Sequence, residues 1–188
     1  MRKLKLQMQM TINGYVGGVN GESDWMTWNP DDEFLAFLKS LIDTSDTLLL
    51  GRKTAEGIIE FWEKTATENP AHPFAGKIAD TQKVVFTKTL GISKWNNTTL
   101  AKGKLAEEIA NLKNQTGKDI LVFGGAGFVS SLIKEGLIDE YHLIINPTAM
   151  GNGMTIFNAL DNIQKFKPVQ SKLFPGGKTV LSFIPKVD

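Results

Sequence analysis

One glycine-rich turn in the sequence has the residue types that suit phosphate binding. Residues 120–123 are apolar and mostly β-favouring, and Gly124, Gly125 and Gly127 follow at once, before an amphipathic segment that begins at Phe128. A turn with so few side chains lets a phosphate approach the backbone, where free N–H groups and the positive end of the helix dipole can hold it. The same glycines could equally serve plain chain reversal, so the motif alone leaves both interpretations open.

A second strand end offers the same chemistry. The apolar run 47–50 leads into Gly51, and Arg52, Lys53 and Thr54 then begin the next predicted helix. The helix N–H groups, the threonine hydroxyl and the two cations could together hold a phosphate. If these cations were ordinary surface residues, their charge would oppose the helix dipole. A bound anion would remove that conflict.

A third strand end carries two hydroxyls that flank a cation. The strand predicted over 83–86 ends in Thr87, Lys88 and Thr89. This group would suit a terminal phosphate such as the 2′-phosphate of NADP, whereas NAD sites typically place an acid near the ribose. The alternative is a polar strand end without a ligand.

Residues 13–28 form a long predicted loop that is rich in glycine and contains two tryptophans. A loop of this length without structure of its own is more often a lid or a binding loop than a plain connection. The alternative is a surface loop pinned by its tryptophans, although aromatics exposed without a ligand would be costly.

Acidic residues begin the helix that follows this loop. Asn29 is its predicted N-cap, and Asp32 and Glu33 stand in its first turn. Glu33 precedes Phe37 by four positions, so these two side chains share a helix face. A carboxylate beside aromatic surface could anchor a cationic or amide-bearing heterocycle. The simpler alternative is that the acids only stabilise the helix end in water.

The composition limits the class of protein and its partners. A chain of 188 residues that is 41% hydrophobic is long enough for one sizeable core, so we expect residues 1–188 to form a single domain. The formal net charge is +1 and no basic cluster is present, which argues against nucleic acid and anionic membranes as partners. There is no cysteine, and His72 and His142 lack a ligand pattern, so we expect no metal site. The N-terminus lacks the apolar run of a signal peptide, which makes the cytoplasm the default location.

The periodicity of the chain predicts strands that alternate with helices and then a closing hairpin. An α/β fold with a largely parallel central sheet and antiparallel edge strands follows from this order. In such sheets ligands bind beyond the carboxyl ends of the strands, so the three polar strand ends can converge on one crevice. The stretch over 63–79 is predicted as a long loop or a short irregular helix. The predicted strands cover 3–12, 47–50, 83–86, 98–100, 120–123, 138–146, 166–174 and 178–184, and the predicted helices include 55–62 and 104–114.

These motifs, taken in order along the chain, resemble dihydrofolate reductase. The later segments 146–147 and 151–157 are more similar to the reductase domain of bacterial riboflavin-biosynthesis enzymes and its stand-alone relatives. The resemblance implies a three-layer α/β/α sandwich with an eight- or nine-stranded mixed sheet and a C-terminal antiparallel hairpin. It also implies NADPH as hydride donor and a small heterocyclic substrate held between the tryptophan loop and the first helix.

The resemblance further implies a role for individual residues. Glu33 would take the place of the acid that binds the pterin ring, with Asp32 as the other candidate, and Trp28 and Phe37 would lie against the substrate. An unusual cis peptide bond is implied between Gly124 and Gly125. The implied cofactor contacts are Gly51, Arg52, Lys53 and Thr54 for the phosphates, Thr87 and Lys88 for the 2′-phosphate, and Gly124, Gly125, Ala126, Gly127 and Phe128 for the pyrophosphate.

Two departures bear on the substrate. Dihydrofolate reductases carry an arginine that grips the folate tail, whereas the matching position here is near Thr81 and the only arginines are Arg2 and Arg52. Asn13 replaces an aspartate at the end of the first strand, which weakens the match to the riboflavin-pathway substrate. We therefore predict an NADPH-dependent reductase of a pteridine- or pyrimidine-like molecule, of the 5-amino-6-(5-phosphoribosylamino)uracil reductase type. Dihydrofolate reductase, or a non-catalytic NADP(H)-binding protein that could be a homodimer, are the alternatives.

Overall fold

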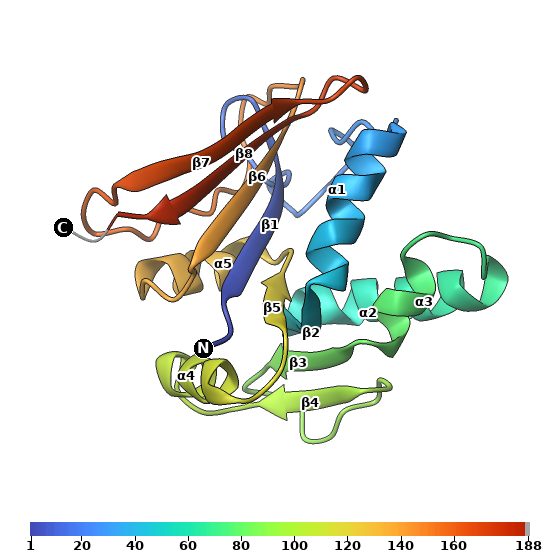
Figure 1. Cartoon of the computed structure of the whole chain (residues 1–188). Coiled ribbons are helices and arrows are strands. Elements are labelled where there is room, and N and C mark those ends of the chain that lie inside the picture. The colour runs from blue at the N-terminus through green and yellow to red at the C-terminus, as the bar shows by residue number, and fades with distance from the viewer. Residues whose placement is uncertain (187–188) are drawn as a thin grey trace.

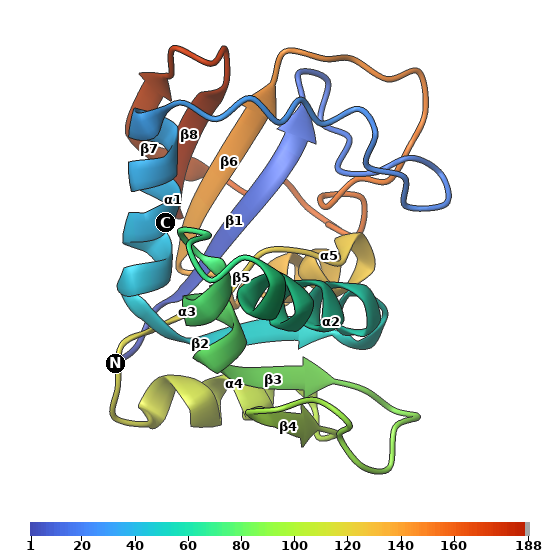
Figure 2. The same cartoon turned by 90° about the vertical axis from the view of Figure 1, so that its right-hand side faces the viewer.

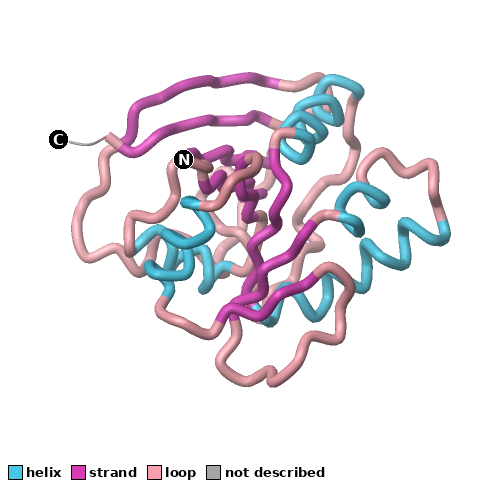
Figure 3. The backbone as a smooth tube through the Cα atoms, turned by 60° about the horizontal axis from the view of Figure 1, so that its bottom comes forward, coloured by secondary structure: helices cyan, strands magenta, loops and turns pink. Residues whose placement is uncertain are grey.

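Eight strands form one mixed sheet in the computed structural model, which describes residues 1–186 (Figure 1). The spatial order is β4-β3-β2-β5-β1-β6-β8-β7, in which β4 to β6 pair in parallel and β8 pairs antiparallel with both β6 and β7. The mixed sheet and its C-terminal hairpin are therefore as predicted, and the hairpin lies at one edge of the sheet (Figure 3). The strands are β1 Leu4–Thr11, β2 Ser45–Gly51, β3 Gln82–Phe86, β4 Thr98–Ala101, β5 Asp119–Val122, β6 Glu140–Asn146, β7 Phe166–Leu173 and β8 Thr179–Pro185.

Helices cover both faces of the sheet and make the predicted three-layer α/β/α sandwich (Figures 1 and 2). On one face, Leu6 and Met8 of β1 pack with Ile109 of α4 and Val129 of α5. On the other face, α1 and α3 pack on β2 and β5, while α2 covers β2 and β3. Burial of apolar side chains on both faces explains the unbroken apolar runs 48–50 in β2 and 120–122 in β5. The helices are α1 Asp32–Asp43, α2 Arg52–Glu68, α3 Ala75–Asp80, α4 Leu105–Asn114 and α5 Ala126–Lys134.

Two local predictions were wrong. The N-cap of α1 is Asp31 rather than Asn29, and its carboxylate accepts hydrogen bonds from Phe34 N and, in the β7–β8 turn, from Gly176 N. The carboxylate therefore ties the start of α1 to the hairpin. The second error concerns residues 63–79, most of which are helical, because α2 continues to Glu68 and α3 follows. The helix-breaking residues Asn69, Pro70 and Pro73 interrupt the helices only over 69–74, and beyond them Ile78 of α3 is buried in an apolar cluster.

Candidate functional site

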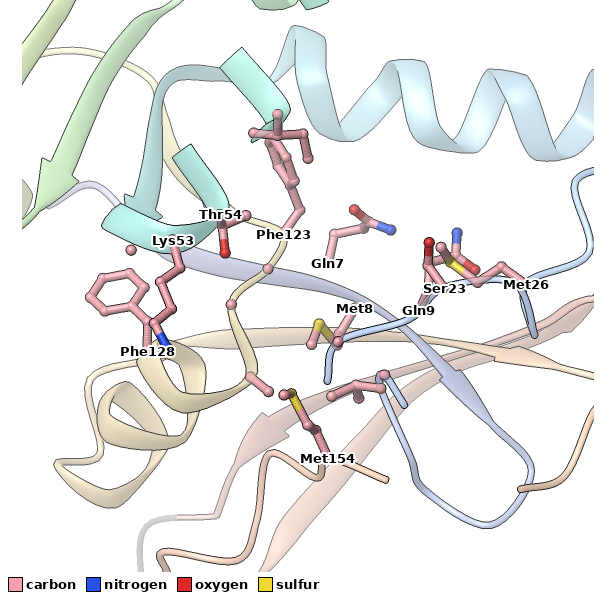
Figure 4. A pocket seen from close by; sticks show the side chains of 18 of the residues that line it. Gln7, Met8, Gln9, Ser23, Met26, Lys53, Thr54, Phe123, Phe128 and Met154 are labelled. Carbon is pink, nitrogen blue, oxygen red and sulfur yellow. The ribbon is translucent and has the colours of Figure 1, made fainter. Parts of the chain in front are cut away.

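A cleft of about 1700 Å³ opens on the face of the sheet that carries α1, α2 and α3. Its floor is β1, and its walls come from α1, α2, the loop after β1 and the turn before α5. A site for one drug-sized ligand measures about 300–1,000 Å³, so this cleft has room for two ligands side by side. Figure 4 shows Thr54 and Phe128 on one side of it and Ser23 and Met26 on the other.

The two glycine turns predicted to bind phosphate lie against each other in this cleft. A Cβ atom added to Gly51 would lie 2.9 Å from Cβ of Phe128, and one added to Gly125 would lie 2.7 Å from Oγ1 of Thr54. Gly124 faces the same threonine, with 3.3 Å to its Cγ2. No larger residue fits these positions without a shift of its neighbours, so the turns need glycine to approach this closely.

Both turns lead into helix N-termini that no side chain caps. Gly51 is the N-cap of α2, and Gly125, in the left-handed region at φ +81°, is the N-cap of α5. Neither helix has an acidic residue in its first turn, whereas α2 has Arg52 and Lys53 there. Two positive helix ends with free N–H groups thus face one cleft, an arrangement that suits a ligand with two linked anionic groups.

The peptide bond between Gly124 and Gly125 is trans, as are all the other peptide bonds of the described residues. The cis bond that the resemblance implied was therefore wrong. The turn is instead made by the positive φ of Gly125, a conformation that glycine adopts without a steric penalty.

Large apolar side chains are exposed at the rim of the cleft. Trp28 is 60% exposed, Phe61 is 58% exposed, and Met26 and Met154 are each 37% exposed, although all four line the cleft. Apolar surface that gathers around an opening is typical of a ligand-binding site. Trp28, which the resemblance implies to lie against the substrate, is one of these exposed lining residues.

The predicted acids lie outside this cleft. Asp32 and Glu33 are exposed, and Glu33 forms an ion pair of 2.7 Å with Lys172 of β7. Phe37 is half-buried and packs against Phe34, which makes it a core residue of α1 rather than a wall of the cleft. Among the described residues, no aspartate or glutamate lines the cleft at all.

The third phosphate-binding candidate also lies beyond the wall. Thr87 is 7% exposed, and its hydroxyl oxygen accepts hydrogen bonds from the backbone N–H groups of Thr89 and Leu90, which makes it a turn cap. Lys88 is exposed and two residues past Phe86, which does line the cleft. The structure thus brings the two glycine turns and Trp28 into one cleft, and leaves Thr87 and Lys88 outside its lining.

Sequence reasoning missed the polar floor of the cleft. Gln7 and Gln9 rise from β1 on the face opposite its apolar residues (Figure 4). Lys178, at the turn before β8, also lines the cleft although only 2% of it is exposed. Burial lowers the pKa of Lys178 from its ordinary value. One signal was available, because glutamines that alternate with apolar residues along a strand indicate a face that is not packed by apolar side chains alone.

Two further findings for the described part of the chain concern metal ligands and membrane-spanning helices. No three histidine, aspartate or glutamate side chains gather as they would around a metal ion. The longest helix, α2, has 17 residues, and none of the helices is long and apolar enough to cross a membrane.

The eight-stranded mixed sheet of the described residues and the large cleft on one of its faces define an α/β protein with room for ligands beside the central strands. The chain belongs to the RibD C-terminal domain family, whose model matches residues 2–180. It is 30% identical over 176 residues to the uncharacterized protein YyaP of Bacillus subtilis, covering 94% of this chain and 91% of that protein.

Solved structures share this fold. A protein of Shewanella sp. PV-4 named for riboflavin biosynthesis matches with a TM-score of 0.75 and 24% identity, over 100% of both chains. The diaminohydroxyphosphoribosylaminopyrimidine deaminase/5-amino-6-(5-phosphoribosylamino)uracil reductase of Thermotoga maritima matches with a TM-score of 0.70 and 16% identity. The match covers 98% of this chain and 57% of the Thermotoga protein. At these identities the likeness establishes the fold.

Proposed function

We propose that this protein is an NADPH-dependent reductase of a small pteridine- or pyrimidine-like molecule. The observation that carries the proposal is the meeting of two uncapped helix N-termini, at Gly51 and Gly125, in one cleft large enough for two ligands. Membership of a reductase-like family agrees with it. The proposal includes substrates of the type that the Thermotoga enzyme's name describes, a phosphoribosylamino-substituted uracil.

The residues present fit a dinucleotide phosphate. Neither α2 nor α5 has a side-chain cap or an acidic residue in its first turn, so the backbone N–H groups there have no side-chain acceptor and can bind an anion. Residues 51–54 and 124–128 would hold the pyrophosphate, and the exposed Lys88, two residues past Phe86 of the cleft wall, would reach the 2′-phosphate. When bound, NADPH would supply the hydride, while the protein orients both ligands and excludes water.

The rest of the cleft suits a flat heterocycle. Gln7 and Gln9 offer amide groups on the floor, and Trp28 stands exposed at the opening. Trp62 and Phe74 add aromatic surface from the side of α2 and α3. An apolar wall with a few polar groups is the usual composition of a site for a planar ring system.

One observation favours a second candidate function. No aspartate or glutamate of the described residues lines the cleft, so the acid that dihydrofolate reductases direct at the pterin ring has no counterpart there. Dihydrofolate reduction is therefore a weaker proposal. A protein that binds NADP(H) without turnover would need the glycine turns but no acid.

Titration with NADPH and NADH tests the cofactor half of the proposal. We expect NADPH to bind more tightly, and we expect Lys88→Ala to reduce that preference while leaving NADH affinity unchanged, because only NADPH carries the 2′-phosphate. Lys64→Ala, on the exposed surface of α2, is the matched control. If neither dinucleotide binds, the reductase and the binding protein are both excluded.

Turnover separates the two remaining functions. A panel of oxidised and dihydro pteridines and of aminouracils is incubated with protein and NADPH, and cofactor oxidation is followed by absorbance. Oxidation that depends on one panel member supports the reductase. Tight NADPH binding with no oxidation across the panel supports the non-catalytic protein.

A further inference from the structure

A chain of hydrogen bonds links β1, β6 and the turn before β8 beneath the part of the cleft floor that Gln7 and Gln9 form. Lys178, just before β8, donates from Nζ to Oδ1 of Asn146 in β6 and to the carbonyl oxygen of Thr27. Nδ2 of Asn146 donates in turn to Oε1 of Gln9 in β1, at 2.9 Å. Gln9 lines the cleft, so the chain ends at a potential ligand contact.

The buried cation fixes the direction of this chain from one end. The ammonium group of Lys178 can only donate hydrogen bonds, so Asn146 must turn its carbonyl oxygen toward it. Asn146 is fully buried, and rotation of its amide would place an N–H group against the cation. That arrangement would leave buried polar groups unpaired, which is costly.

Backbone carbonyl groups fix the same direction independently. Nδ2 of Asn146 also faces the carbonyl oxygens of Met10 at 3.3 Å and Ile144 at 3.4 Å, which can only accept. Both ends of the asparagine amide are thus determined by groups that cannot exchange their roles. The side-chain amide of Gln9 must therefore point its oxygen toward Nδ2 of Asn146, as observed.

We infer that Gln9 presents its amide N–H₂ group to the cleft and selects a substrate whose facing atom is a hydrogen-bond acceptor. Within the described part of the chain, no residue accepts a hydrogen bond from Nε2 of Gln9. The matching substrate atom is a ring carbonyl oxygen or an unprotonated ring nitrogen. A substrate amino group at that place would put its own N–H donor against the N–H₂ donor of Gln9. Asn146 and Lys178 are positioning residues that act through Gln9. This inference rests on the proposed function, because it takes the ligand above Gln9 to be the substrate.

The test uses the four pteridines that carry either an oxo or an amino group at C2 and at C4, titrated calorimetrically into the NADPH-saturated protein. For the wild type, we expect exchange of oxo for amino at one of these positions to weaken binding about tenfold or more, as for one mismatched hydrogen bond. Gln9→Glu keeps the acceptor for Asn146 but presents an oxygen to the cleft. The same exchange is therefore expected to strengthen binding to this variant.

Two further variants separate the inference from a simple effect of charge or of folding. Gln7→Glu brings the same charge to the same floor without a link to Asn146, so a preference that inverts in both variants would overturn the assignment to Gln9. Asn146→Leu removes the tether, and the oxo-to-amino ratio is expected to fall below about threefold even where overall affinity is retained.

The outcomes distinguish this inference from the proposed function. If NADPH and the pteridines bind with the same ranking in the wild type and in Gln9→Glu, the inference is overturned and the proposed function stands. If the wild type binds neither NADPH nor any of the four pteridines, the proposed function fails and the inference fails with it.

Discussion

Gly125, the N-cap of α5, and Gly127, in the first turn of that helix, are two positions apart, and alanine is expected to lower stability at the first and raise it at the second. Gly125 has a φ of +81°, and an added Cβ would lie 2.7 Å from Oγ1 of Thr54. Gly127 lies in the first turn of α5, and outside its chain neighbours and the backbone of its own helix no heavy atom of the described residues lies within 4 Å of the corresponding Cβ. The pair therefore compares one substitution at a strained position and at an open one.

The magnitude of each effect follows from these surroundings. A left-handed backbone costs an L-residue about 1–2 kcal/mol, and the contact with Thr54 adds to that, so Gly125→Ala should lower the free energy of unfolding by about 2–3 kcal/mol. Gly127→Ala should raise it by up to about 1 kcal/mol, because alanine favours helix over glycine. For a chain of this length each kcal/mol shifts Tm by about 2–4 °C.

Thermal and urea unfolding of both variants measures these shifts. A third variant, Gly125→Ala with Thr54→Ala, removes the contact but keeps the unfavourable φ, so it should recover only part of the loss relative to Thr54→Ala alone. Equal Tm values for Gly125→Ala and the wild type, or the same sign for both single substitutions, would refute the geometry of the turn given above.

Three more predictions concern ionisable groups away from this turn. Lys178→Met leaves Oδ1 of the buried Asn146 without its donor and should lower the free energy of unfolding by about 1–3 kcal/mol in urea titrations, and an unchanged midpoint would contradict this. Burial lowers the pKa of His142 below 6.5 in the folded protein, so the unfolded chain binds more protons and stability should decline as pH falls from 6.5 through the folded pKa. His142→Gln should remove that part of the pH dependence of unfolding. Asp32→Asn and Glu33→Gln should leave pteridine affinity unchanged, because both acids lie outside the cleft. If one of these variants lost affinity, the residue replaced in it would be the acid that binds the substrate.

The glycine turns could be predicted from the sequence because their structure is local. An apolar strand, a few glycines and an amphipathic helix determine one another over about a dozen residues, and the dipole argument needs only the first helical turn. The two turns at Gly51 and Gly125 then converge because parallel strands end at the same edge of the sheet. Sequence order and sheet topology were sufficient for this half of the cleft.

The surroundings of Glu33 could not be predicted from local sequence in the same way. The helical period explains why Phe34 and Leu41 share the buried face of α1. It could not tell which partner would meet Glu33, because that partner is Lys172 of β7, far away in sequence. Lys172 belongs to the hairpin that closes the sheet, so the surroundings of the acid depend on a long-range strand pairing.

The substrate half is a product of strand register rather than of any motif. Gln9 and Asn146 come together because β1 and β6 pair in parallel with Gln9 opposite Ile144 and Thr11 opposite Asn146, which sets both polar side chains on one face. The two halves of the cleft should therefore respond differently to substitution. Changes in the glycine turns alter backbone geometry and should affect stability and cofactor affinity together. Changes in the Gln9 network alter which hydrogen-bonding groups face the cleft, and should shift substrate preference while NADPH affinity is retained.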